Sequence, residues 1–157
     1  MTREHLATYL NDHLAGSNVA IEILDHLSAE TSSGPTYAGL RKEFDEDRHE
    51  LKAIMTRLRV VESRVRKAGS WIAEGFAELK LEVDDEPNGP LRRLERLELL
   101  AVGIHGKVAL WKALDAALGS HADLENVDYA RLIQRGQEQY DRIETLRLEA
   151  ARAALVP

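Results

Sequence analysis

The chain has 157 residues and a formal net charge of −6, with 44% hydrophobic residues, 31% charged residues and no cysteine. This composition excludes a disordered chain and a membrane protein, and the acidic balance argues against a nucleic-acid-binding protein that works by neutralising phosphates. Without cysteine there is neither a disulfide framework nor a thiolate metal site. We therefore expect one globular domain over residues 1–157, located in the cytoplasm, with no signal sequence and no transmembrane segment.

Glycine and proline divide the sequence into four long helical segments. Gly34 and Pro35 break the pattern after the first segment because both residues are unfavourable in a continuing helix. Pro90 suits the first turn of the third helix, and we expect Gly119 to end that helix in a left-handed conformation. The predicted helices cover residues 3–31, 36–60, 90–118 and 127–155. The predicted fold class is therefore all-α, a four-helix bundle.

A long connection joins the second predicted helix to the third. Ser70 is a suitable cap for a short extra helix within this crossover. The apolar side of that helix would consist of Trp71, Ile72, Phe76 and Leu79. The crossover gives a bundle of two helical hairpins enough chain to pass from one hairpin to the other.

A basic segment precedes this short helix. It contains Arg57, Arg59, Arg64, Arg66 and Lys67, followed by Trp71. One interpretation is a docking site for an anionic partner or a membrane surface, with Trp71 as an aromatic anchor. In the other, which we favour, the arginines remain in water while Trp71 packs the crossover onto the bundle.

Polar residues interrupt the apolar stripes that appear when residues are placed 100° apart around each helix axis. They are His13, Asp47, Glu98, His105 and Arg147. Because an unpaired buried charge is costly, these side chains must pair, reach water or hold a ligand. In two antiparallel hairpins, Asp47, Glu98 and Arg147 fall at similar heights. We predict that the Arg147 guanidinium bridges Asp47 and Glu98 in a core ion network, with a functional polar pocket as the alternative.

Two helical hairpins joined by a long crossover resemble the ferritin-like superfamily, including uncharacterised bacterial members, and the order of acidic residues is also similar. In its di-iron members each hairpin supplies one lone Glu and one Glu-x-x-His motif. Glu46 and His49 match that motif, whereas Glu144 is followed by Arg147 at the histidine position. Carried over to this sequence, the implied metal ligands are Glu22, Glu46, His49, Glu98 and Glu144.

The departures from this pattern decide our preference. Arg147 places a fixed positive charge where a metal ligand is expected, and Glu22, Glu46 and His49 point away from the apolar stripes. We therefore expect a non-catalytic helical domain, structural or partner-binding, with an Arg–carboxylate network and no cofactor. The alternative implied by the resemblance is a di-iron or di-manganese oxidoreductase or metal-binding protein.

The third helix carries a second apolar face behind its main stripe. This face contains Leu99, Leu110, Leu114 and Ala117. A helix that is apolar around most of its circumference must be covered on two sides. The crossover or a second copy of the chain could supply that cover. The partner is thus an unknown protein or, in a homodimer, the chain itself.

Overall fold

The computed structural model describes residues 3–30, 34–63 and 89–157. They form α1 (Arg3–Glu30), α2 (Gly34–Arg57), α4 (Pro90–Leu118), the short 3-10 helix η1 (Ala122–Leu124) and α5 (Tyr129–Leu155). The prediction of an all-α chain with four long helices is confirmed for these residues, which contain no strand. The short helix predicted after Ser70, and Arg64, Arg66, Lys67 and Trp71, lie outside the described residues.

The helices begin where the sequence provides suitable first residues. Pro90 is the first residue of α4, as predicted. The side chain of Asp128 caps α5 by accepting a hydrogen bond from the Arg131 amide at 2.9 Å.

The predicted left-handed end at Gly119 is wrong, because its φ is −58°. Glycine is needed there for a different reason, the close approach of the Asp115 carbonyl oxygen. A Cβ at this position would lie 2.5 Å from that oxygen. Among the described residues, the left-handed conformation occurs instead at Arg59, with φ 55°, just beyond the end of α2.

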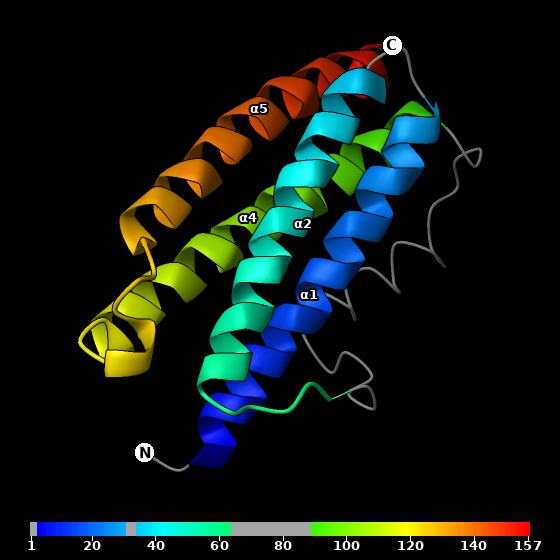
Figure 1. Ribbon diagram of the computed structural model, residues 1–157. Helices are drawn as coiled ribbons and strands as arrows, with labels where there is room; N and C mark the ends of the chain where they lie inside the picture. The colour runs from blue at the N-terminus through cyan, green and yellow to red at the C-terminus, as the bar shows by residue number, and fades with distance from the viewer. Residues whose placement is uncertain (1–2, 31–33, 64–88) are drawn as a thin grey trace.

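The helices form two antiparallel hairpins, α1–α2 and α4–α5, with α1 also packed against α4 (Figure 1). The helices α2 and α4 run in the same direction, so α2 ends at the opposite end of the bundle from the start of α4. The most extensive close backbone packing is between α4 and α5, whereas the backbones of α2 and α5 make few or no close contacts. Long polar side chains bridge this wider gap, as described below.

The apolar core is divided into two clusters. One includes Leu24, Tyr37 and Leu97, and the other includes Leu10 and Ile54. The first lies towards the end of α1 and the start of α4, and the second towards the start of α1 and the end of α4. The middle of the bundle, between these clusters, contains the polar groups and the cavity that make up the candidate site.

The buried residues of α5 follow a strict alternation of three and four positions. They are Tyr129, Leu132, Gly136, Gln139, Ile143, Leu146 and Ala150. This spacing is typical of a narrow seam between packed helices. It explains why Gln139 is buried and why Arg147, next to Leu146, lies beside the seam.

Candidate functional site

A buried carboxylate on α2 forms the centre of the polar middle of the bundle. The Asp47 side chain is only 3% exposed. Its Oδ1 accepts hydrogen bonds from two guanidinium nitrogens of Arg135, with Nε at 2.9 Å. Its Oδ2 accepts from Lys107 Nζ at 2.6 Å and from Gln139 Nε2 at 3.1 Å. Four donors from α4 and α5 therefore occupy both oxygens of Asp47.

Lys107 connects this carboxylate to the neighbouring helices. Its ammonium also donates to Gln139 Oε1 and lies 3.9 Å from the centre of the Phe44 ring. Burial lowers the pKa of Lys107, although the Asp47 charge opposes this change. The cation is thus held by a carboxylate, an amide and an aromatic face rather than by water.

Further ion pairs continue from Asp47 towards the surface between α2 and α5. Arg135 Nη1 lies 3.3 Å from Glu46 Oε2, and Arg142 Nη1 donates to Glu43 Oε1 at 2.9 Å. Burial alone would raise the pKa of Glu43. Hydrogen bonds from Arg142 and Gln139 lower the pKa by more than burial raises it, so the pKa of Glu43 falls overall. We call this set the ion layer; its charged members are Glu43, Glu46, Asp47, Lys107, Arg135 and Arg142. Three carboxylates balance three cations, so the ion layer is neutral.

The predicted partner of Asp47 is wrong. Arg147 contacts Glu98, at 3.4 Å, and makes a bidentate pair with Glu144, at 2.7 and 2.8 Å. Its contact with Glu98 confirms half of the predicted bridge. The other half fails because Leu146 takes the inward position of α5 and Arg147 lies outside it.

The remaining predicted polar residues of α4 are also on the outside. Glu98 is half-exposed. His105 is exposed, and its ring lies tilted against that of Tyr140 with the ring centres 4.4 Å apart. The pKa of Arg147 is raised, chiefly by its hydrogen bonds to Glu144 and also by Glu98 and Tyr140. We call this group the outer seam, comprising Glu98, His105, Tyr140, Glu144 and Arg147. The prediction that Glu98, His105 and Arg147 lie in the core is wrong, because Glu98 and His105 are exposed and Arg147 is only partly buried.

The metal ligands implied by the resemblance do not converge. Glu22, Glu46, His49 and Glu98 are exposed. Glu144 is held by Arg147, and the His49 ring hydrogen-bonds the Asp45 carbonyl at 2.7 Å. Across residues 3–30, 34–63 and 89–157, no three His, Asp or Glu side chains form a group that could hold a metal ion. The described residues thus do not fit a di-iron or di-manganese centre.

Sequence reasoning missed five members of this site, Glu43, Lys107, Arg135, Gln139 and Arg142. Gln139 lies three residues after Gly136 and four before Ile143, so a strict three-and-four spacing would have placed it in the core. Arg135 and Arg142 give no comparable signal. Their long side chains reach inward from positions beside the apolar stripes.

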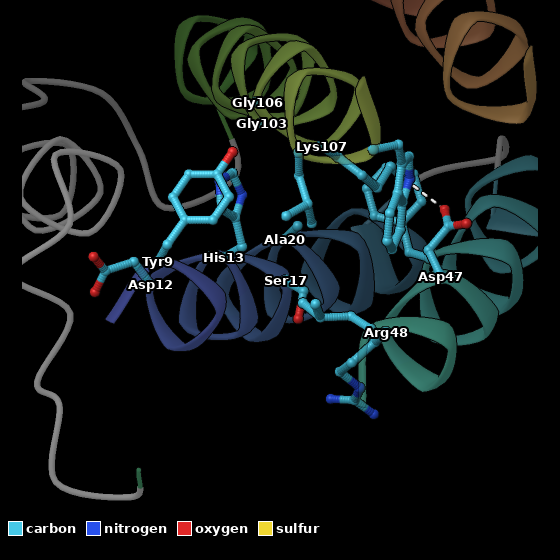
Figure 2. Close-up of a pocket in the computed structure, with 15 residues that line it drawn as sticks. Tyr9, Asp12, His13, Ser17, Ala20, Asp47, Arg48, Gly103, Gly106 and Lys107 are labelled. Atoms are coloured by element: carbon cyan, nitrogen blue, oxygen red, sulfur yellow. Dashed lines mark hydrogen bonds and ion pairs between the residues drawn. The ribbon is translucent and has the colours of Figure 1, made fainter. Parts of the chain in front are cut away.

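A cavity of about 240 Å³ lies beside the ion layer, between α1, α2 and α4 (Figure 2). The rings of Tyr9 and His13, 4.7 Å apart and edge to face, stand at one end, and the Lys107–Asp47 pair stands at the other. Burial lowers the pKa of His13, and the nearby Asp12 charge partly opposes this. His13 is thus half-buried at the cavity, while its predicted companion His105 belongs to the outer seam.

Comparison of the chain with models of known protein families, with curated proteins and with solved structures gives no match. In the part of the chain that the structure describes, no helix combines the length and the apolar character needed to cross a membrane. The resemblance to the ferritin-like superfamily therefore still depends on the order of acidic residues and on the two-hairpin plan. It remains a prediction.

Proposed function

We propose that this chain is a non-catalytic helical domain of the ferritin-like kind, structural or partner-binding, in which the ion layer takes the central position of a metal centre. The observation that carries the proposal is the complete occupation of Asp47. Each of its oxygens already accepts two hydrogen bonds. Asp47 is also the one fully buried carboxylate among the described residues.

Metal binding at Asp47 would be costly in this arrangement. A cation at its oxygens would displace Lys107 and Arg135. The largely buried Lys107 would lose its carboxylate partner, and Arg135 would keep only its contact with the exposed Glu46. A closed network with all its members paired instead favours one arrangement of the helices. The ion layer joins α2 of the first hairpin to both helices of the second hairpin, α4 and α5.

The arrangement of the helices supports the ferritin-like part of the proposal. The hairpins α1–α2 and α4–α5 pack together, and α2 and α4 run in the same direction. A chain with one long connection between two hairpins has this plan. The position of Arg147, where the second Glu-x-x-His motif of a di-iron protein has its histidine, supports the loss of a metal-binding function.

Metal retention tests the proposal. The purified chain is mixed anaerobically with ferrous or manganous ion and desalted, and bound metal is measured by mass spectrometry. We expect no stoichiometric retention. Arg147→His, which restores Glu-x-x-His after Glu144, should not create it, because Glu22, Glu46 and His49 still point outward.

The opposite result would favour the runner-up function, a di-iron or di-manganese oxidoreductase. That result is nearly stoichiometric metal in the wild-type chain that is lost in both Glu98→Gln and Glu144→Gln. Loss in these variants separates a specific site from metal held loosely by surface carboxylates. The control is Asp123→Asn in η1, outside the four long helices that carry the implied ligands, and it should leave retention unchanged.

Light scattering over a range of concentrations tests whether the partner is a second copy. Within the chain, Leu110 and Leu114 are already buried in the core, so these members of the second apolar face of α4 need no other subunit. Leu99 is partly buried against the core and Ala117 is exposed. A concentration-dependent dimer would identify the chain itself as partner. A monomer throughout would leave a different protein as partner.

A further inference from the structure

A seven-residue repeat runs through the buried sides of the four long helices that the structure describes. Core positions alternate by three and four residues, as in the seam of α5, so residues seven apart form a column along one inner face. In each helix, one such column has a polar residue between two apolar residues. These columns are Leu10, Ser17 and Leu24 in α1; Leu40, Asp47 and Ile54 in α2; Leu100, Lys107 and Leu114 in α4; and Leu132, Gln139 and Leu146 in α5.

The four columns lie level with one another in the bundle. The residues at one end all belong to the first apolar cluster; they are Leu24, Leu40, Leu100 and Leu146. The residues at the other end all belong to the second cluster; they are Leu10, Ile54, Leu114 and Leu132. We call the four middle residues the central layer; they are Ser17, Asp47, Lys107 and Gln139. A polar layer therefore lies between two apolar layers that are built from the same repeat positions.

The hydrogen bonds of the central layer pass from one hairpin to the other. Asp47 belongs to the α1–α2 hairpin, and its Oδ2 accepts from two side chains of the α4–α5 hairpin. The donors are Lys107 Nζ, at 2.6 Å, and Gln139 Nε2, at 3.1 Å. The Ser17 hydroxyl instead donates to the Leu14 carbonyl of its own helix, at 2.7 Å. The other three side chains are thus paired with one another only when Asp47 lies level with Lys107 and Gln139.

A slip of one hairpin along the other by one repeat would separate these partners. Such a slip moves the helices by about 10 Å, the length of seven helical residues, and leaves the contacts inside each hairpin unchanged. Two neighbouring columns are apolar throughout and would tolerate it: Tyr37, Phe44 and Leu51 in α2, and Leu97, Ile104 and Trp111 in α4. The central layer would not, because Asp47 would then face Leu114 while Lys107 would face Leu40. Burying charges away from their partners is costly, so the polar contacts, and not the apolar ones, select the observed alignment.

We infer that the central layer fixes the register of the two hairpins, by pairing Asp47 with Lys107 and Gln139 in one alignment and separating them one repeat away. A polar residue at a core position of a coiled coil has this role, and it specifies register at a cost in stability. The inference rests on the structural part of the proposed function. Metal retained by the wild-type chain would overturn the proposed function, whereas the distances described below decide the register, so the two failures are distinguishable.

Replacing three members of the central layer together tests this role. Asp47→Leu, Lys107→Leu and Gln139→Leu in one variant make all three columns apolar throughout. Replacing a whole buried ion pair by apolar residues is often neutral or stabilising, unlike the removal of one partner. Arg135 keeps its contact with the exposed Glu46. We therefore expect the urea midpoint of the triple variant to equal or exceed that of the wild type, while its register is no longer unique.

Spin labels measure the register, because the chain has no cysteine of its own. Ala38→Cys in α2 and Ala116→Cys in α4 place two labels at exposed positions on different hairpins. With the central layer intact, pulsed electron paramagnetic resonance should give one distance between them. In the triple variant we expect a second distance, after a slip of about 10 Å along the helices. Ala116→Cys with Ala153→Cys, both exposed and within the α4–α5 hairpin, should give one unchanged distance in both backgrounds.

The matched control replaces an ion pair outside the central layer. Glu144→Leu with Arg147→Leu removes the bidentate pair of the outer seam, and the labels at positions 38 and 116 should still give one distance. A folded triple variant with the single wild-type distance would overturn the inference, because apolar packing alone would then fix the register. A triple variant that circular dichroism shows to be unfolded would also overturn it, because the central layer would then be required for folding itself.

Discussion

The ion layer and the outer seam contain the same chemical groups in different surroundings. In the ion layer Asp47 is 3% exposed and is held by Lys107 and Arg135. In the outer seam Arg147 holds Glu144 and Glu98, and the Glu98 side chain is 51% exposed. Exposed ion pairs contribute little to stability, whereas breaking a buried pair is costly. The two regions therefore should respond very differently to the loss of one charge.

The distance between helices explains why the two networks formed where they did. The helices α4 and α5 approach closely, with Gly136 against Val108, so charged side chains between them lie on the outside. The helices α2 and α5 are farther apart, and the long side chains of Arg135, Gln139 and Arg142 cross the gap to reach acceptors on α2. Helix spacing thus determines which charges become buried.

The largest expected effect comes from Asp47→Asn. This change keeps the side-chain shape but leaves Lys107 and Arg135 without their buried counterion. It also places the NH2 group of the asparagine, a donor, against side chains that are themselves donors. We expect a loss of about 3–5 kcal/mol in the free energy of unfolding, measured by urea denaturation. The matched control is Glu46→Gln, because Glu46 contacts the same Arg135 from an exposed position. Its change should be below about 1 kcal/mol, and equal losses in both variants would contradict the importance of burial.

Much of the fold, and less of the site, could be predicted from the sequence. The α4 helix was predicted from Pro90 to residue 118, because proline and glycine mark its ends locally. The burial of Asp47 followed from its position in an apolar stripe. Its partners did not follow, since they depend on the distance between α2 and α5. Placing residues 100° apart around α5 also did not show that Leu146, and not the neighbouring Arg147, points inward.

Gly136→Ala tests the close approach of α4 and α5 on which this explanation depends. The added Cβ would lie 2.6 Å from Val108 Cγ2, so either the Val108 side chain must rotate or the helices must move apart. We expect a loss of about 1–3 kcal/mol in the free energy of unfolding. Adding Val108→Ala should restore part of that loss by removing the methyl group. Gly39→Ala, where nothing lies within 4 Å of the new Cβ, should be neutral or slightly stabilising.

The middle of the bundle should also differ from the surface in its response to pH. Burial lowers the pKa of His13 below its usual value, so the unfolded chain takes up a proton at a higher pH than the folded chain does. The contribution of the neutral His13 imidazole to the free energy of unfolding is fully present above about pH 6.5. This contribution is lost as the pH falls through the lowered pKa of the folded chain. Urea midpoints between about pH 8 and about pH 5 should therefore fall less in His13→Gln than in the wild type. His49→Gln, which removes an exposed imidazole, should leave the wild-type slope unchanged.

The smallest expected effect is that of Arg147→Leu in the outer seam. Glu144 and Glu98 lose their cation in this variant, but both carboxylates can turn to water, so neither is left buried and unpaired. The variant also places an apolar side chain next to Leu146 at the edge of the core. We expect the urea midpoint to stay within experimental error of the wild type and to depend little on salt. A loss as large as that of Asp47→Asn would mean that the outer seam is shielded from water in solution, and burial would then no longer distinguish the two networks.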